Sequence, residues 1–236
     1  MSIEQPAKLD LSGMIQHTLG RRLEAGELGV LLSRAGVGKT ACLTHVALEH
    51  LFQGQEVVHA SIRETPETVK IWYQELIKNI VAAQSLAEEE TAYLQSQVET
   101  HRSILTYHQD AFSPTRMEQG IRNLKEQIGF HPSLVVLDGL DFGRVTRATL
   151  EEFQAVLKRL EVAAWMTART HRHITTVNER GIPYPCHDLD DLFQVILALD
   201  PLPDGIRLMA LKLYDRNHPE HLTISLNTQT FMLKKD

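Results

Sequence analysis

The sequence predicts an α/β fold with a mainly parallel central sheet flanked by helices and with β-hairpins toward the C-terminus. Short apolar runs alternate with amphipathic helical segments along most of the chain, which is the pattern of a buried parallel sheet. The apolar run at residues 28–32 leads directly into a glycine-containing loop, a Lys-Thr pair and a helical segment. A second apolar run, Leu134–Asp138, ends in a carboxylate. These observations favour a ligand site at the carboxyl edge of the sheet.

Length and composition narrow the class of protein. The 236 residues suit one α/β domain, residues 1–236, with a full core. A net charge of −6 argues against a chain built as a whole to bind nucleic acid. The two cysteines, Cys42 and Cys186, are far apart, which predicts neither a disulfide framework nor a zinc site and indicates a reducing cytoplasm. We find no signal peptide and no apolar run of about 20 residues, so we expect no membrane span.

The elements follow from hydrophobic periodicity and from cap and turn residues. Residues 1–24 are expected to be a lead-in, in which residues 10–12 cap a short helix at 13–19. Further helices are expected at residues 41–52, 113–129 and 149–160, with two more in a helical excursion over 67–100. Strands are expected at residues 28–32, 56–62, 103–107, 134–138, 162–167, 192–199, 206–213 and 222–226, with a last short strand at 231–233. Residues 172–188 show no periodicity and are expected to form a polar loop.

The loop after the first strand carries the most specific motif. Amide groups of such a loop, together with the helix N-terminus, offer hydrogen bonds and a positive dipole to a polyphosphate. Gly36 and Gly38 allow positive φ and close approach of the backbone. Lys39 would reach the β- and γ-phosphates, and the Thr40 hydroxyl would ligate Mg²⁺. The predicted nucleotide-binding residues are Ser33, Arg34, Ala35, Gly36, Val37, Gly38, Lys39, Thr40 and Ala41.

This motif departs from its usual form at one position, because Ser33 stands where the pattern has its first glycine. The alternative interpretation is a chance Gly-Lys-Thr at a turn between a strand and a helix. The apolar strand before the loop and the helix after it favour the nucleotide site.

Two carboxylates follow neighbouring predicted strands. Glu64 comes directly after the strand at 56–62 and before Thr65 and Pro66, which suit the cap and first turn of a helix. Asp138 closes the apolar run, at the position where an Mg²⁺ partner is expected. Each has a simpler alternative: Glu64 as an acid near a helix N-terminus, and Asp138 as the end of an ordinary strand.

The order of these parts resembles the RecA-like ATPases, and within them the KaiC-like family, over about residues 24–234. The Glu64-Thr65-Pro66 step resembles the KaiC-family strand end that carries the catalytic glutamate. KaiC-like proteins often have two adjacent acids there, whereas this chain has Arg63 and Glu64, which leaves Glu64 as the base. This chain has one RecA-like unit, not a tandem pair.

The resemblance also extends to the C-terminal strands. Residues 210–217, followed by 222–224, are similar to the strand of RecA-like hexamers whose cations reach the neighbouring subunit's γ-phosphate. It implies that Lys212 and Arg216 are catalytic in trans, although they stand four apart, a wider spacing than usual. No arginine of the predicted site is expected to act in cis. A ring or filament of identical subunits follows from this arrangement.

The resemblance implies an Mg-ATP-binding ATPase that acts as an oligomeric nucleotide-driven switch or motor. Lys39 and the loop amides would neutralise phosphate charge, and Glu64 would orient or deprotonate the attacking water. The expected partners are ATP, further copies of the chain and a protein partner.

Two alternatives remain open. One is a nucleotide-binding switch or scaffold with little or no hydrolysis. The other is a recombinase or helicase relative that acts on single-stranded DNA through the loop at 169–186, where Arg169, Arg172, Arg180 and Tyr184 combine positive charge with an aromatic ring. The acidic net charge weighs against DNA, and a mobile solvated loop is the simpler interpretation.

Overall fold

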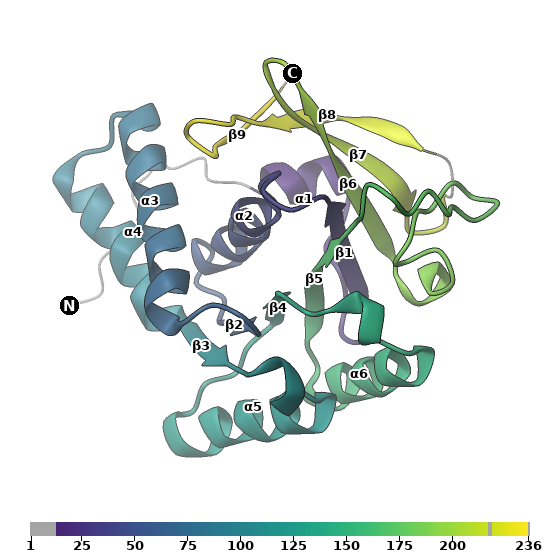
Figure 1. Ribbon diagram of the computed structural model, residues 1–236. Helices are drawn as coiled ribbons and strands as arrows, with labels where there is room; N and C mark the ends of the chain where they lie inside the picture. Colours follow the sequence, from purple (N-terminus) through teal and green to yellow (C-terminus); the bar gives the residue numbers. More distant parts are fainter. Residues whose placement is uncertain (1–12, 217–218, 236) are drawn as a thin grey trace.

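The computed structural model describes residues 13–216 and 219–235, and a nine-stranded sheet runs through this part of the chain (Figure 1). The strand order is β3-β2-β4-β5-β1-β6-β7-β8-β9. Pairing is parallel from β3 to β6, and β6 to β9 are antiparallel neighbours. The predicted fold class, a mainly parallel sheet with helices and C-terminal hairpins, is confirmed.

The strands are β1 (Leu28–Ser33), β2 (Val57–Ser61), β3 (Arg102–Thr106), β4 (Leu134–Asp138), β5 (Ala163–Arg169), β6 (Val195–Leu202), β7 (Gly205–Leu213), β8 (Glu220–Leu226) and β9 (Leu233–Lys235). The helices are α1 (Met14–Leu19), α2 (Lys39–Leu51), α3 (Pro66–Gln84), α4 (Glu88–His101), α5 (Pro114–Ile128) and α6 (Arg147–Leu160). Short 3-10 turns are η1 (Gln109–Ala111), η2 (Phe142–Arg144) and η3 (Asp190–Leu192).

Helices cover both faces of the sheet, and each strand side chain points to one of two cores (Figure 1). Leu134 and Val136 of β4 pack in the core formed with α1 to α4. Val135 and Leu137 pack in the opposite core, with α5 and α6. This alternation is the period of two expected of a strand, and burial on both sides explains why the strand sequence is continuously apolar.

Cap residues set several helix starts as expected. The Thr65 hydroxyl accepts a hydrogen bond from Thr68 N, and Pro66 occupies the first turn of α3. Ser113 caps α5 in the same way, by accepting from Arg116 N. The predicted cap at residues 10–12 lies outside the described residues.

The helix α1 uses a different partner for its first amides. Glu49 of α2 accepts hydrogen bonds from Ile15 N at 2.7 Å and from Gln16 N at 3.2 Å. A buried carboxylate on a neighbouring helix therefore does the work of a cap.

Two boundaries differ from the predictions. Strand β6 begins at Val195 because residues 190–192 form η3. The last strand begins at Leu233, two residues later than expected, because Asn227 folds the chain into a turn by accepting hydrogen bonds from Gln229 N and Thr230 N. None of the helices in the described part of the chain combines the length and apolar character that a membrane crossing demands.

Candidate nucleotide-binding site

A cavity of about 440 Å³ lies at the carboxyl ends of the parallel strands. Lys39 and Thr40 from the start of α2, Glu64 from the loop after β2 and Asp138 from the end of β4 all line it. The structure thus brings together four residues that the sequence analysis selected from three separate segments. Their meeting follows from parallel pairing, because β1, β2 and β4 all end at the same edge of the sheet.

The loop before α2 has the backbone conformation that its glycines were expected to allow. Gly36 has φ of 77° and Gly38 has φ of 110°, both in the left-handed region. A Cβ built on Gly38 would lie 2.8 Å from Leu226 Cδ2, so a larger residue would strain the backbone and also clash. Gly38 is the N-cap residue of α2 and gives the helix no side-chain cap. The helix N-terminus therefore faces the loop with amides that suit an anion.

Lys39 lies against the first residues of its own loop. Its ammonium donates hydrogen bonds to Ser33 O at 3.0 Å, to Ser33 Oγ at 3.1 Å and to Arg34 O at 2.8 Å. Burial lowers the pKa of Lys39 to about 8, an effect that Asp138 opposes and Arg169 reinforces. The serine that replaces the usual glycine thus contributes a hydroxyl that contacts this cation.

Thr40 and Asp138 form the hydrogen bond at the centre of the site. Thr40 Oγ1 donates to Asp138 Oδ2 at 2.6 Å, and Thr167 Oγ1 donates to the other carboxylate oxygen. Sequence reasoning missed Thr167, which lies near the end of β5. The available signal was a polar residue at the end of the strand adjacent to β4, where Leu137 pairs with Met166.

The two oxygen donors, the Thr40 hydroxyl and the Asp138 carboxylate, are of the type that Mg²⁺ prefers. Within residues 13–216 and 219–235, no group of three or more His, Cys, Asp and Glu side chains is arranged to hold a metal ion alone. The residues present therefore fit a metal that takes its remaining ligands from water and from phosphate oxygens, as Mg²⁺ does in nucleotide sites.

Glu64 lies exposed on the wall of the same cavity. Its backbone N donates to Ser61 Oγ at 3.1 Å, which fixes the turn out of β2. The next residue, Thr65, is the N-cap of α3. Glu64 therefore precedes the helix instead of belonging to its first turn, and its carboxylate is free to act in the cavity.

Arginines of the same copy also line the cavity, contrary to the expectation that none is placed there. Arg63 lies beside Glu64, and Arg169 is the exposed last residue of β5. Sequence reasoning assigned Arg169 to the loop, but β5 extends to it because Ser33 and Arg169 pair across β1 and β5. Tyr184 also lines the cavity, so the long loop after β5 folds back over the site.

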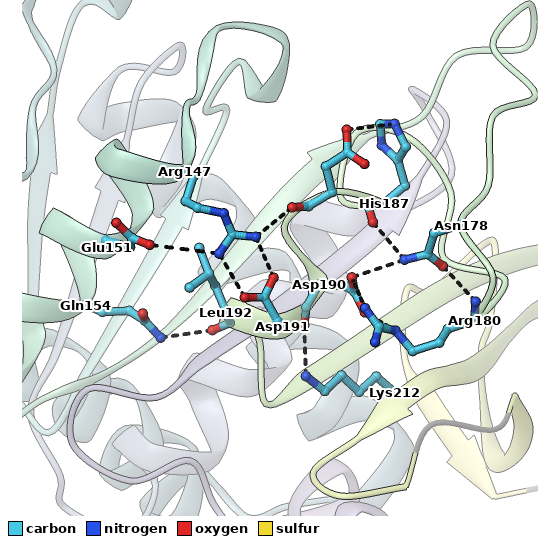
Figure 2. Close-up of polar contacts among 11 residues, drawn as sticks. Arg147, Glu151, Gln154, Asn178, Arg180, His187, Asp190, Asp191, Leu192 and Lys212 are labelled. Carbon is cyan, nitrogen blue, oxygen red and sulfur yellow. Dashed lines mark hydrogen bonds and ion pairs between the residues drawn. The ribbon is translucent and has the colours of Figure 1, made fainter.

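Lys212 and Arg216, the predicted trans-acting cations, do not line the cavity of their own copy. The Lys212 ammonium donates to Asp190 O at 2.8 Å, as Figure 2 shows, and burial lowers its pKa. Arg216 is exposed and pairs with Glu220 at 3.4 Å. Their catalytic role stays a prediction.

The buried Asp190 also organises the loop after β5 (Figure 2). Its carboxylate pairs with Arg180 at 2.7 Å and accepts a hydrogen bond from Asn178 Nδ2 at 3.1 Å. Arg147 of α6 holds the neighbouring Asp191 through Nη1 at 2.8 Å and Nη2 at 2.7 Å. The loop is therefore anchored at its end by charged contacts that periodicity does not reveal.

Comparisons with known proteins support the fold. No protein-family model matches the chain, and no curated protein matches its sequence. In contrast, 487 solved chains are similar in structure. One is the ATPase domain of a helicase, with a TM-score of 0.65 and 12% sequence identity, over 91% of this chain and 86% of that chain. The chain therefore has the fold of a RecA-like ATPase domain. Because unrelated functions share folds, the function has to be argued from the site.

Proposed function

We propose that the chain binds Mg-ATP in this cavity and hydrolyses it, as an oligomeric nucleotide-driven switch or motor of the KaiC-like type. The observation that carries the proposal is the hydrogen bond of 2.6 Å between Thr40 and Asp138, next to the Lys39 ammonium in one cavity. A hydroxyl, a carboxylate and an ammonium at the start of an uncapped helix form the set that phosphoryl transfer requires.

Each side chain has a role that follows from its position. Lys39 donates to loop oxygens of Ser33 and Arg34, and phosphate oxygens would take their place as acceptors. Phosphate charge would favour the protonated form of Lys39, against the burial that lowers its pKa. Thr40 and Asp138 would hold Mg²⁺, which when bound neutralises charge that develops on the phosphates.

Glu64 would accept the proton of the attacking water or orient that water. Arg63 and Arg169 add positive charge to the same cavity. Lys212 and Arg216 lie outside it, so they would reach a γ-phosphate only in a neighbouring copy. This geometry supports the proposed oligomer, in which one copy completes the site of the next.

The contacts of the long loop give little support to the alternative of single-stranded DNA binding. Arg180 is paired with the buried Asp190, and Arg169 and Tyr184 lie at the nucleotide cavity. Much of the positive and aromatic character of the loop is therefore already engaged within the chain.

The test is the affinity for Mg-ATP, measured by calorimetry on the parent protein, on Lys39→Ala and on a control, Lys125→Ala. Lys125 is an exposed residue of α5 and lies outside the cavity. Removing the Lys39 ammonium should weaken binding strongly, because it removes the charge at the β- and γ-phosphates. The control should bind like the parent. Equal affinity of Lys39→Ala and the parent would contradict the proposal.

A further inference from the structure

A second cavity, of about 1060 Å³, lies between α3, α4 and the edge strand β3. Apolar side chains from all three elements line part of it, among them Ile77, Val98 and Ile104. Its lining does not overlap that of the nucleotide cavity. Its volume is in the range of pockets that take small molecules, which are mostly apolar with a few placed polar groups.

The polar group that distinguishes this cavity is Arg102, the first residue of β3. Within the described part of the chain, its buried Nε has no hydrogen-bond partner, and its guanidinium forms no ion pair. Glu99 acts on its charge only at longer range. Burial lowers the pKa of Arg102, because a guanidinium taken out of water without a partner is destabilised.

The orientation of Arg102 is fixed by an aromatic ring. Its guanidinium carbon lies 4.3 Å from the centre of the Tyr73 ring, a cation–π contact. Tyr73 is buried, and its hydroxyl forms a hydrogen bond of 3.0 Å with His59 Nδ1. The ring is therefore held from behind, and the planar guanidinium is positioned before any ligand arrives.

The charges around the cavity complement an anion. Lys70 and Lys78, exposed on α3, also line it, and Glu99 is the one acid in its lining. We propose that this cavity is a binding site for a small organic anion, a carboxylate or phosphate group on an apolar body. The guanidinium of Arg102 would bind the acid group through two parallel hydrogen bonds, and the aliphatic side chains would contact the apolar body.

The test uses three probes in ligand-observed NMR titrations of the full chain. Cinnamate carries the acid on an apolar body, cinnamamide is its neutral isostere, and phenyl phosphate replaces the carboxylate by phosphate. We expect cinnamate to bind at least about tenfold more tightly than cinnamamide, since a charge-assisted hydrogen bond contributes that much. Comparison of cinnamate with phenyl phosphate distinguishes the two acid groups. Equal binding of cinnamate and cinnamamide, or no binding of either anion at millimolar concentration, would overturn the proposal.

Variants locate the binding. Arg102→Gln should remove the preference for cinnamate over cinnamamide, whereas Lys39→Ala, in the nucleotide cavity, should leave it unchanged. Should Arg102→Gln fail to fold, Lys70→Glu changes an exposed residue of the cavity wall and should weaken cinnamate binding several-fold. Lys125→Glu, on α5, is its control and should bind like the parent. Parental affinity in Lys70→Glu, or loss of cinnamate binding in Lys39→Ala, would contradict the assignment.

Discussion

The buried carboxylate of Glu49 should make the stability of this protein depend on pH. Glu49 accepts the first amides of α1, yet burial raises its pKa from 4.5 to about 7, against the opposing effects of those hydrogen bonds and of Arg22. A folded-state pKa above the unfolded value means that the carboxyl group contributes stability below pH 4.5. That contribution is lost as pH rises through about 7.

The size of the effect follows from the two pKa values. Their difference, at about 1.36 kcal/mol per pH unit, sets an upper limit of about 3 kcal/mol. Between pH 5 and pH 8 the expected loss is about 2 to 3 kcal/mol, because part of the unfolded-state ionisation is already complete at about pH 5. Glu49→Gln keeps the shape and an oxygen acceptor for α1 but cannot ionise. Its stability relative to the parent should therefore rise by this amount between the two pH values.

The assay is urea unfolding followed by circular dichroism at pH 5 and pH 8, for the parent, Glu49→Gln and a control, Glu126→Gln. Glu126 is exposed on α5. The control should follow the parent at both pH values. A difference between Glu49→Gln and the parent that is the same at both pH values would refute the reasoning, because ionisation of Glu49 would then cost the fold nothing.

Three further predictions concern chemistry. Glu64→Gln should bind ATP normally and turn it over at least about a hundredfold more slowly, whereas Glu67→Gln on α3 should be unaffected; parental turnover in Glu64→Gln would make Glu64 a structural acid only. Arg216→Ala should lose most activity, by about 10³-fold if it is an arginine finger, and mixing it with Glu64→Gln should restore part; a silent Arg216→Ala or no restoration would contradict the trans role. Burial raises the pKa of Cys42 to about 12 and that of Cys186 even further, so neither thiol should react with a thiol reagent at pH 7 until urea unfolds the chain; rapid labelling of the folded protein would contradict this.

The parts of the site that sequence could predict are those with local signals. Lys39 and Thr40 follow a glycine-containing loop between a strand and a helix, and Asp138 closes an apolar run. Their meeting in one cavity then needs only parallel pairing, because all lie at the carboxyl edge of one sheet. Thr167 and Arg169 needed more, since their importance depends on β5 lying between β4 and β1.

Other features depend on contacts between residues distant in sequence. The loop before η3 has no periodicity, yet Asp190 anchors it through Arg180 and Lys212, which lie on different segments. Arg102 gave no local signal either, because its burial arises only when α3 and α4 pack beside β3. Hydrophobic periodicity predicts which face of an element is buried, but it does not reveal which charged group that burial leaves unpaired.

The central claim is that assembled copies hydrolyse Mg-ATP in the cavity that contains Lys39, Glu64 and Asp138. The most direct test is phosphate release measured across a range of protein concentrations, with the size of the protein determined in the same samples with and without Mg-ATP. The account predicts that Mg-ATP promotes a larger assembly and that activity per subunit rises with concentration, because one copy completes the site of the next. A protein that stays monomeric with Mg-ATP and whose activity per subunit is zero or independent of concentration would contradict it.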